Sequence, residues 1–237
     1  MRELETLKKW IDESRNIVFF GGAGVSTESG IPDFRGQGGL YGRKYAYPPE
    51  EMLSVGFFLR NPEAFYQFYR EEVLCLAAEP NAAHRKLAEW EREGKLKAVV
   101  TQNIDGLHQK AGSKRVYELH GSVYKNRCTR CQRAFGVEAV AEVEGVPRCQ
   151  CGGVIRPEVV LYGENLDTDV LRGAAAAIAS ADLLIVGGTS LVVYPAAGLL
   201  DYYGGNRLAL VNRTGTGRDD LANLAVRAPI GEVFSRL

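Results

Sequence analysis

The chain has 237 residues with 29 basic and 29 acidic side chains, so its formal net charge is zero, and 46% of the residues are hydrophobic. These values exclude a mainly disordered chain, which would combine low hydrophobicity with a high net charge. They also disfavour a dedicated polyanion binder, because such domains usually carry a clear basic excess. We therefore do not expect nucleic acid as a partner.

No stretch reaches the roughly 18 apolar residues that a transmembrane helix needs. The N-terminus, Met1–Glu5, is charged and lacks the basic and apolar regions of a secretory signal. The sequence therefore predicts a protein without membrane contact that resides in the cytoplasm.

The predicted elements alternate between helices and strands along most of the chain. Helical spacing of apolar residues predicts helices over 4–14, 82–93 and 171–181, and short apolar runs predict strands over 16–20, 96–101, 182–188 and 208–211. This alternation predicts an α/β fold with a doubly wound parallel sheet. Two segments interrupt it: a Gly/Tyr/Pro-rich loop over 36–49 with an aromatic helix over 62–76, and a cysteine-rich segment over 123–156.

A glycine-rich loop, Gly21–Gly30, follows the first predicted strand. A strand that ends in glycines and leads into a helix presents free N–H groups that favour a phosphate, and Ser26 or Thr27 could cap that helix. The dehydrogenase fingerprint fits poorly, because Thr27 stands where its third glycine should be and the expected acid about 20 positions later is missing. The loop therefore indicates a nucleotide-phosphate site of another type, with an ordinary glycine turn as the alternative.

Polar and aromatic residues follow at two places where a ligand is expected. Asp33, Phe34 and Arg35 supply an acid, a flat ring and a guanidinium that suits a pyrophosphate. The segment 101–105 follows the second predicted strand, where open parallel sheets bind ligands, and its side chains could hold ribose hydroxyls and amides. For this segment, helix capping by Asn103 or Asp105 is the alternative and could coexist with binding.

The chain has three histidines, of which His120 is the candidate general base because it titrates near neutral pH and precedes a glycine. From the local sequence alone, a structural role for His120 stays open. His84 lies among apolar residues of a predicted helix, so we expect it to be buried. His108 follows the polar strand end and is expected at the surface or in a supporting position.

Four of the five cysteines form two close pairs. Cys128 and Cys131 make a C-x2-C pair, and Cys149 and Cys151 make a C-x-C pair after the intervening residues 132–148. This spacing predicts one closed, structural zinc site, with a redox pair or unrelated thiols as the alternative. Cys75 lies outside the cluster and is expected to be a core thiol.

Together and in this order, the motifs resemble those of the sirtuins, the NAD-dependent protein deacylases, over nearly the whole chain. The resemblance lies in Gly22–Ser26 with its continuation to Arg35, Thr101–Asp105, His120-Gly121, the four clustered cysteines, Val159–Glu164 and Gly188–Pro195. The chain is similar to compact bacterial-type members. The resemblance implies a Rossmann-type NAD-binding domain over 1–37, 80–122 and 157–237, a cofactor loop and helical module over 38–79, and an inserted zinc-ribbon module over 123–156.

The resemblance also implies the residues of the site. The implied cofactor-binding residues are Gly22, Ala23, Gly24, Thr27, Asp33, Phe34, Arg35, Gln102, Asn103, Ile104, Asp105, Gly188, Thr189, Ser190, Asn212 and, from position alone, Ile230. The peptide would pair as an added strand between two segments, one with Val160, Leu161, Tyr162, Gly163 and Glu164 and the other with Val192 and Val193. Tyr162 stands where many relatives carry phenylalanine.

The implied activity is deacetylation of protein lysine with NAD as co-substrate, one structural Zn²⁺, and His120 and Asn103 as catalytic residues. The acyl oxygen attacks the ribose carbon as nicotinamide leaves. His120 then takes the proton of a ribose hydroxyl, and water completes the reaction to give free lysine and O-acyl-ADP-ribose. We expect acylated proteins or peptides as partners and a monomeric enzyme.

The acyl preference is predicted from the helix after the long loop. Relatives that favour acidic acyl groups carry Tyr-x-x-Arg there, whereas Tyr66 is followed three positions later by Tyr69. This difference predicts deacetylation over desuccinylation. The alternatives are a deacylase for succinyl or longer groups, a protein ADP-ribosyltransferase and, from another class, an NAD(P) oxidoreductase with structural zinc.

Overall fold

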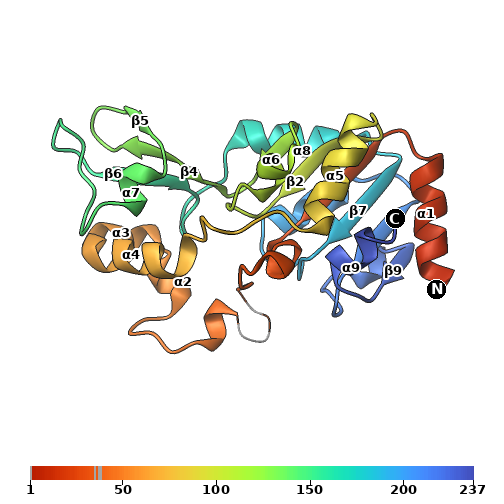
Figure 1. The fold of residues 1–237 in the computed structure, drawn as a ribbon, viewed down its shortest axis with the longest axis horizontal. Helices are drawn as coiled ribbons and strands as arrows, with labels where there is room; N and C mark the ends of the chain where they lie inside the picture. The colour runs from red at the N-terminus through yellow and green to blue at the C-terminus, as the bar shows by residue number, and fades with distance from the viewer. Residues whose placement is uncertain (1, 35, 37–38) are drawn as a thin grey trace.

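The computed structural model describes residues 2–34, 36 and 39–237. Its centre is a parallel sheet with the strand order β3-β2-β1-β7-β8-β9 (Figure 1). The strands are β1 (Ile17–Gly21), β2 (Leu96–Thr101), β3 (Val116–Glu118), β7 (Leu183–Gly187), β8 (Leu208–Val211) and β9 (Leu224–Val226). The chain moves outward from β1 to β3 and then returns to the other side of β1 with β7. This order confirms the predicted doubly wound sheet and creates a crevice at the carboxyl ends of the central strands.

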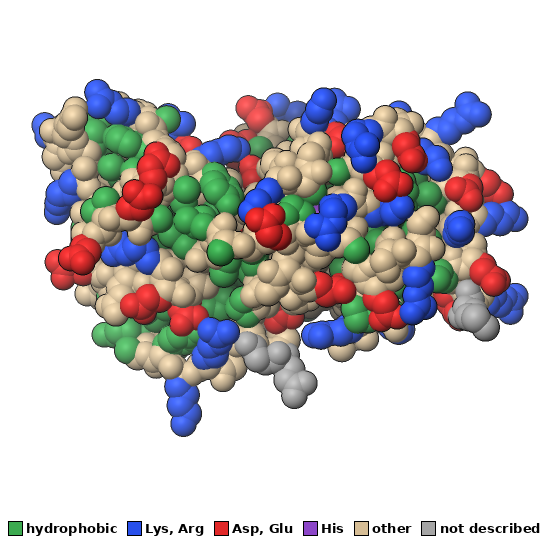
Figure 2. All heavy atoms as spheres, in the orientation of Figure 1, with side chains coloured by type: hydrophobic (Ala, Val, Ile, Leu, Met, Phe, Trp, Pro, Cys, Tyr) green, Lys and Arg blue, Asp and Glu red, His purple; other side chains and the backbone are tan. Residues whose placement is uncertain are grey.

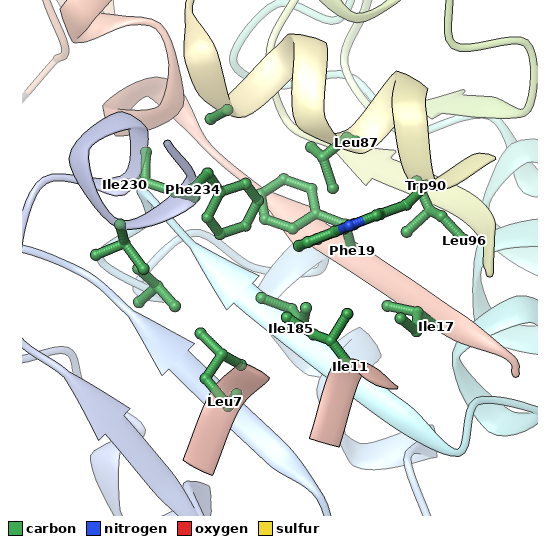
Figure 3. Close-up of a cluster of buried hydrophobic side chains, with 14 of the residues drawn as sticks. Leu7, Ile11, Ile17, Phe19, Leu87, Trp90, Leu96, Ile185, Ile230 and Phe234 are labelled. Atoms are coloured by element: carbon green, nitrogen blue, oxygen red, sulfur yellow. The ribbon is translucent and has the colours of Figure 1, made fainter. Parts of the chain in front are cut away.

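Helices cover both faces of this sheet, which explains why the central strands β1, β7 and β8 are buried along their whole length. Ile17 and Phe19 of β1 point into a cluster with α1 (Arg2–Glu13), α5 (Ala82–Arg92) and α9 (Ile230–Phe234), as Figure 3 shows. The alternate residues Val18 and Phe20 point into a second cluster with α8 (Thr168–Ala179) and the 3₁₀ helix η5 (Ala196–Tyr202). Successive side chains of a strand face opposite sides, so β1, β2, β7 and β8 each contribute to both clusters.

The two buried histidines lie where α5 meets α6 (Leu107–Ala111). The side chain of Asn81 accepts the N–H of Ala83 at 2.9 Å, and Nδ1 of His84 accepts the N–H of Asn81 at 3.3 Å, which forms a capping box at the start of α5. His84 is buried as predicted. His108 is also buried, with its ring centroid 4.7 Å from that of His84, so the expected surface position is wrong.

A second unit lies at the other end of the molecule (Figure 1). It contains an antiparallel sheet of β4 (Gly121–Cys128), β5 (Ala134–Phe135) and β6 (Ile155–Val159), with α7 (Glu138–Ala141). Beside it are α2 (Pro49–Met52), α3 (Val55–Arg60), α4 (Pro62–Phe68) and the π-helical turn η4 (Tyr69–Val73), so the predicted helix over 62–76 ends at Val73. Both parts share one hydrophobic cluster. Because β4 and β6 run across the predicted module boundaries, those boundaries stay a prediction.

The distribution of charged side chains on the surface agrees with the zero net charge of the chain. Figure 2 shows basic and acidic side chains interspersed over the face in view. Among the described residues, no helix has the length and apolar character needed to cross a membrane.

Candidate functional site

A cleft of about 1190 Å³ opens at the carboxyl ends of the central strands and extends to the second unit. Its lining includes Gly22, Ala23, Gly24, Thr27, Asp33, Phe34, Gln102, Asn103, Ile104, Asp105, His120, Val160, Leu161, Tyr162, Gly163, Glu164, Gly188, Thr189, Ser190, Val193, Asn212 and Ile230. These residues therefore surround one space, while their individual roles stay predictions. Arg35 lies outside the described residues. Val192 is 51% exposed and is not part of the lining.

The glycine loop packs directly against the loop that follows β7. The N–H of Gly24 donates to the carbonyl oxygen of Gly188 at 2.8 Å. A Cβ atom on Gly24 would lie 2.8 Å from Cα of Gly188, and one on Gly188, whose φ is +60°, would lie 2.3 Å from the nitrogen of Val25. These two glycines are therefore required by the contact between the two loops, besides any approach of a phosphate.

The helix predicted after the glycines consists of two short 3₁₀ helices, η1 (Ala23–Val25) and η2 (Thr27–Ser29). The predicted capping is wrong, because no side chain caps either helix. The hydroxyl of Thr27 donates to the carbonyl oxygen of Gly24 at 3.0 Å. Ser26 is buried and bonds to the polar end of β2 instead, a role that its place after Gly-x-Gly did not reveal.

Three polar side chains form a network between the glycine loop and the segment after β2. Ser26 Oγ donates to Asp105 Oδ2 at 2.6 Å, and Asn103 Nδ2 donates to Ser26 Oγ at 3.0 Å. Asp105 Oδ1 also accepts the N–H of Leu107, the first residue of α6, at 2.9 Å, although the N-cap of this helix is Gly106 and has no side-chain cap hydrogen bond. Burial raises the pKa of the Asp105 carboxyl, and the bond from Ser26 opposes this shift.

The ring of His120 is held by a hydrogen bond through one of its two nitrogens. Its Nδ1 lies 2.9 Å from the carbonyl oxygen of Gln102, which can only accept, so Nδ1 carries the proton and donates. Nε2 is therefore the unprotonated nitrogen. Burial lowers the pKa of His120, while the bond to Gln102 opposes the shift. The neighbouring Gly121 has φ +77°, and a Cβ there would lie 2.0 Å from the carbonyl oxygen of Glu158, so only glycine fits after this histidine.

The far side of the cleft is closed by the ends of β7 and β8. Thr189 Oγ1 accepts the side-chain N–H of Gln102 at 3.0 Å and the N–H of Leu191 at 3.2 Å. Asn212 donates through Nδ2 to the carbonyl oxygen of Thr214 at 3.0 Å. Ile230, at the start of α9, is 3% exposed and belongs to the core as well as to the lining.

The segment 160–164 follows β6 and is held by its main chain. The N–H of Val160 donates to the carbonyl oxygen of His120 at 2.9 Å. Tyr162 donates its N–H to Leu53 at 2.9 Å and accepts the N–H of Val55 at 3.0 Å, which makes an isolated parallel bridge between Tyr162 and Ser54. Glu164 Oε2 accepts the N–H of Leu161 at 2.9 Å and pairs with Arg156. The segment is thus rigidly placed beside the candidate base.

Of the two tyrosines compared with the Tyr-x-x-Arg pattern, Tyr69 lines the cleft and Tyr66 does not. Tyr66 is buried, donates its hydroxyl to the carbonyl oxygen of Ile155 at 2.7 Å and is absent from the lining. Tyr69 and Glu72 line the cleft instead. Glu72 pairs with Arg43 at 2.7 Å. Cys75 is half-buried and also lines the cleft, so it is not the core thiol expected.

The four clustered cysteines converge on one point in the second unit. All four sulfur atoms lie within 4.8 Å of one another, with Cys128 to Cys151 at 3.4 Å and Cys131 to Cys149 at 3.7 Å. These separations exceed an S–S bond of about 2.05 Å. They approach the edge of roughly 3.8 Å that a tetrahedron with Zn–S bonds of about 2.3 Å requires. The donor set and its spacing therefore fit zinc.

Comparisons with known proteins give consistent similarities. A model described as the Sir2 family matches residues 22–195. The chain is 55% identical over 236 residues to a protein named NAD-dependent protein deacetylase from Clostridium acetobutylicum, covering 98% of this chain and 96% of the relative. It is similar to a solved complex of Sir2 with p53 peptide and NAD⁺, with a TM-score of 0.87, 44% identity and coverage of 98% and 96%. A Sir2 variant with deacetylated p53 peptide and 3'-O-acetyl ADP ribose gives a TM-score of 0.90 at 44% identity and the same coverage.

Proposed function

The chain belongs to the Sir2 family, and from this premise we propose that it is an NAD-dependent protein lysine deacetylase. The observation that carries the proposal is the placement of His120. A histidine with its proton on Nδ1 and its free nitrogen on Nε2 lines the same cleft as the glycine loop and the segment 160–164. The names of the relatives favour this activity over hydride transfer, and the broken dehydrogenase fingerprint agrees with them.

The cleft offers groups for each part of NAD. The loops at Gly22–Gly24 and Gly188–Ser190 would hold the phosphates, and Gln102 and Asn212 would contact the riboses. Asn103 and Asp105 would receive the nicotinamide amide, because the Ser26 network already fixes their orientation. NAD supplies the ribose carbon that accepts the acyl oxygen, and nicotinamide is the leaving group.

His120 would move the proton of the second step. Its Nε2 accepts the proton of a ribose hydroxyl, so that the hydroxyl oxygen can attack the carbon of the former acyl group. The Gln102 carbonyl holds the ring in the required tautomer and stabilises the imidazolium that forms. The lowered pKa keeps Nε2 free at neutral pH.

The acylated peptide would add a strand between 160–164 and 188–193. Val160 N–H is already bonded to His120, so peptide register and base position are linked through one main-chain contact. Backbone pairing gives affinity with little demand on side-chain sequence. We propose acetyl over succinyl, since Tyr69 stands in the lining where relatives that favour acidic acyl groups carry arginine, and Glu72 adds a carboxylate beside it. We also propose that the enzyme is a monomer and that it resides in the cytoplasm.

Cys128, Cys131, Cys149 and Cys151 would hold one Zn²⁺. A closed set of four thiolates leaves no open coordination position, so the metal would stabilise β4–β6 and take no part in the reaction. The second unit supplies residues of the cleft such as Val123 and Tyr124, and the metal would therefore support the site indirectly.

The experiment that tests the function is incubation of an acetyl-lysine peptide with NAD, analysed by mass spectrometry. We expect free-lysine peptide, nicotinamide and O-acetyl-ADP-ribose in equal amounts. ADP-ribose attached to protein would instead identify an ADP-ribosyltransferase, and absorbance of reduced cofactor would identify an oxidoreductase. Unchanged acetyl peptide with either of these products contradicts the proposal.

A further inference from the structure

The hydroxyl groups of Tyr41 and Tyr162 meet at 2.5 Å, although 121 positions separate them in the sequence. Tyr41 lies in the short 3₁₀ helix η3 (Leu40–Gly42), within the segment that joins the glycine loop to α2. Tyr162 lies in the segment 160–164 on the substrate side of the cleft. The contact therefore connects the two sides of the cleft.

Tyr162 provides a fixed anchor for this contact. Both of its main-chain hydrogen-bonding groups are used, the N–H by Leu53 and the carbonyl oxygen by Val55. Its side chain is 39% exposed, and the residue belongs to the cleft lining. With the backbone held on both sides, the hydroxyl can reach only a limited region, and Tyr41 occupies it.

Tyr41 is tied in turn to the cofactor side. Its N–H donates to the carbonyl oxygen of Phe34 at 2.9 Å, and its ring meets the Phe34 ring edge-on at 5.8 Å. The preceding Leu40 donates its N–H to the carbonyl oxygen of Asp33 at 3.0 Å. Asp33 and Phe34 line the cleft, so a displacement of Tyr41 would displace them as well.

We propose that the Tyr41–Tyr162 hydrogen bond is a positioning contact that holds Asp33 and Phe34 in the arrangement that receives NAD. The inference rests on the proposed function for the identity of that ligand. Holding Asp33 and Phe34 in place before binding removes a conformational entropy cost from association. Neither hydroxyl takes part in the chemistry. A phenylalanine at either position keeps the ring packing and removes only the bond.

The test is a double-mutant cycle with Tyr41→Phe, Tyr162→Phe and the double variant, and with Tyr202→Phe as control. Tyr202 is exposed on η5 and lies outside the cleft lining. Calorimetry measures the Kd for NAD alone and for an acetyl-lysine peptide alone. We expect each single variant to weaken NAD binding about three- to tenfold, as the loss of one neutral hydrogen bond does. The double variant should equal the weaker single variant, because all three lack the same bond.

An NAD Kd within about twofold of wild type in both single variants would overturn the proposal. Additive effects in the double variant would also overturn it, since independent roles add. In Tyr41→Phe the affinity for the peptide should stay unchanged, and a loss confined to the peptide in this variant contradicts the positioning role. If the wild type binds NAD but does not turn over acetyl peptide, the proposed function is refuted. The double-mutant cycle then still tests whether the Tyr41–Tyr162 hydrogen bond supports NAD binding. Wild type that does not bind NAD refutes both.

Discussion

Ser26 donates a 2.6 Å hydrogen bond to the carboxylate of Asp105 and thereby joins the glycine loop after β1 to the polar segment after β2. Asn103 donates to the same serine oxygen, so one hydroxyl orients two residues of the cleft. Burial alone would favour protonation of Asp105, and the serine supports its charged form. The orientations of Asn103 and Asp105, on which nicotinamide binding would depend, are therefore set by the buried side chain of Ser26.

Removing this hydroxyl should damage the reaction more than the fold. We expect Ser26→Ala to lower kcat/KM for NAD by about 10- to 100-fold, because a hydrogen bond to a charged group contributes roughly 1.5–3 kcal/mol. Ser235→Ala is the matched control, since Ser235 bonds only locally to Glu232 at the end of α9. Steady-state kinetics at saturating peptide measure the effect. Equal values for the two variants would show that the network does not orient the site.

The pH dependence of the reaction should report the burial of His120. The proposed reaction needs Nε2 of His120 unprotonated, and burial lowers the pKa of this histidine below its usual value near 6.5. Activity should therefore rise with pH on an acidic limb whose midpoint lies below 6.5 and should be constant through neutral pH. His120→Ala should lose about 10²- to 10⁴-fold in kcat, the contribution of a general base. A midpoint above 6.5, or a fast alanine variant, would exclude His120 as the base.

The fold was predictable where burial on both faces leaves a continuous apolar run, as in β1 and β7. The short strands β3 and β9 and the antiparallel strands β4–β6 were not predicted as strands. Their pairing joins segments that are distant in the sequence, such as Arg127 with Arg156, and the local composition gives little indication of it. The burial of His108 was missed for a related reason, because it depends on the packing of α6 against α5.

The site was predictable as a set of motifs, but its finer contacts depend on three-dimensional packing. Tyr66 in α4 donates its hydroxyl to Ile155, whereas Tyr69 and Glu72 in the π-helical turn η4 line the cleft. A regular helix assumed from sequence gives no sign of this turn. The contact of Gly24 with Gly188 was likewise not predicted, because the glycine motif was interpreted only as a phosphate site.

Loss of one zinc ligand should remove both metal and stability. We expect wild type to contain about one zinc per chain and Cys128→Ala to contain none, with a lower melting temperature, because metal binding contributes directly to folding. Cys75→Ala is the matched control and should keep its zinc, since Cys75 lies outside the cluster. Elemental analysis of freshly purified protein decides the point. Zinc-free wild type, or a zinc-containing Cys128→Ala variant, contradicts the assignment.

The acyl preference should depend on Glu72. Replacing this acid by arginine places a group in the lining that can bind a carboxylate through two hydrogen bonds. We expect Glu72→Arg to raise the ratio of succinyl- to acetyl-lysine turnover by about tenfold or more. Glu71→Arg makes the same charge change outside the cleft lining and should leave the ratio unaltered. Competition between the two peptides, measured by mass spectrometry, gives the ratio, and equal ratios in both variants would remove Glu72 from the acyl pocket.

The buried histidine pair should make the fold sensitive to mild acid. Burial, with a smaller effect of Arg85, lowers the pKa of His84 to about 4, whereas an unfolded histidine has a pKa near 6.5. Between these values the unfolded chain binds more protons than the folded one, so stability falls as the pH decreases from 6.5 towards 4. At pH 4.5 the loss from this residue alone is on the order of 2 kcal/mol.

His84→Gln isolates this contribution. Glutamine can accept the N–H of Asn81 and preserve the capping box, but it does not titrate. We expect the variant to match wild type at pH 7 within about 1 kcal/mol, the scale of one cap interaction, and to lose less stability on acidification. Urea unfolding at pH 7 and 4.5 measures both. The cysteine site is common to the two proteins, so its own acid sensitivity cancels in the comparison. Parallel losses in both would show that His84 is not the group that titrates.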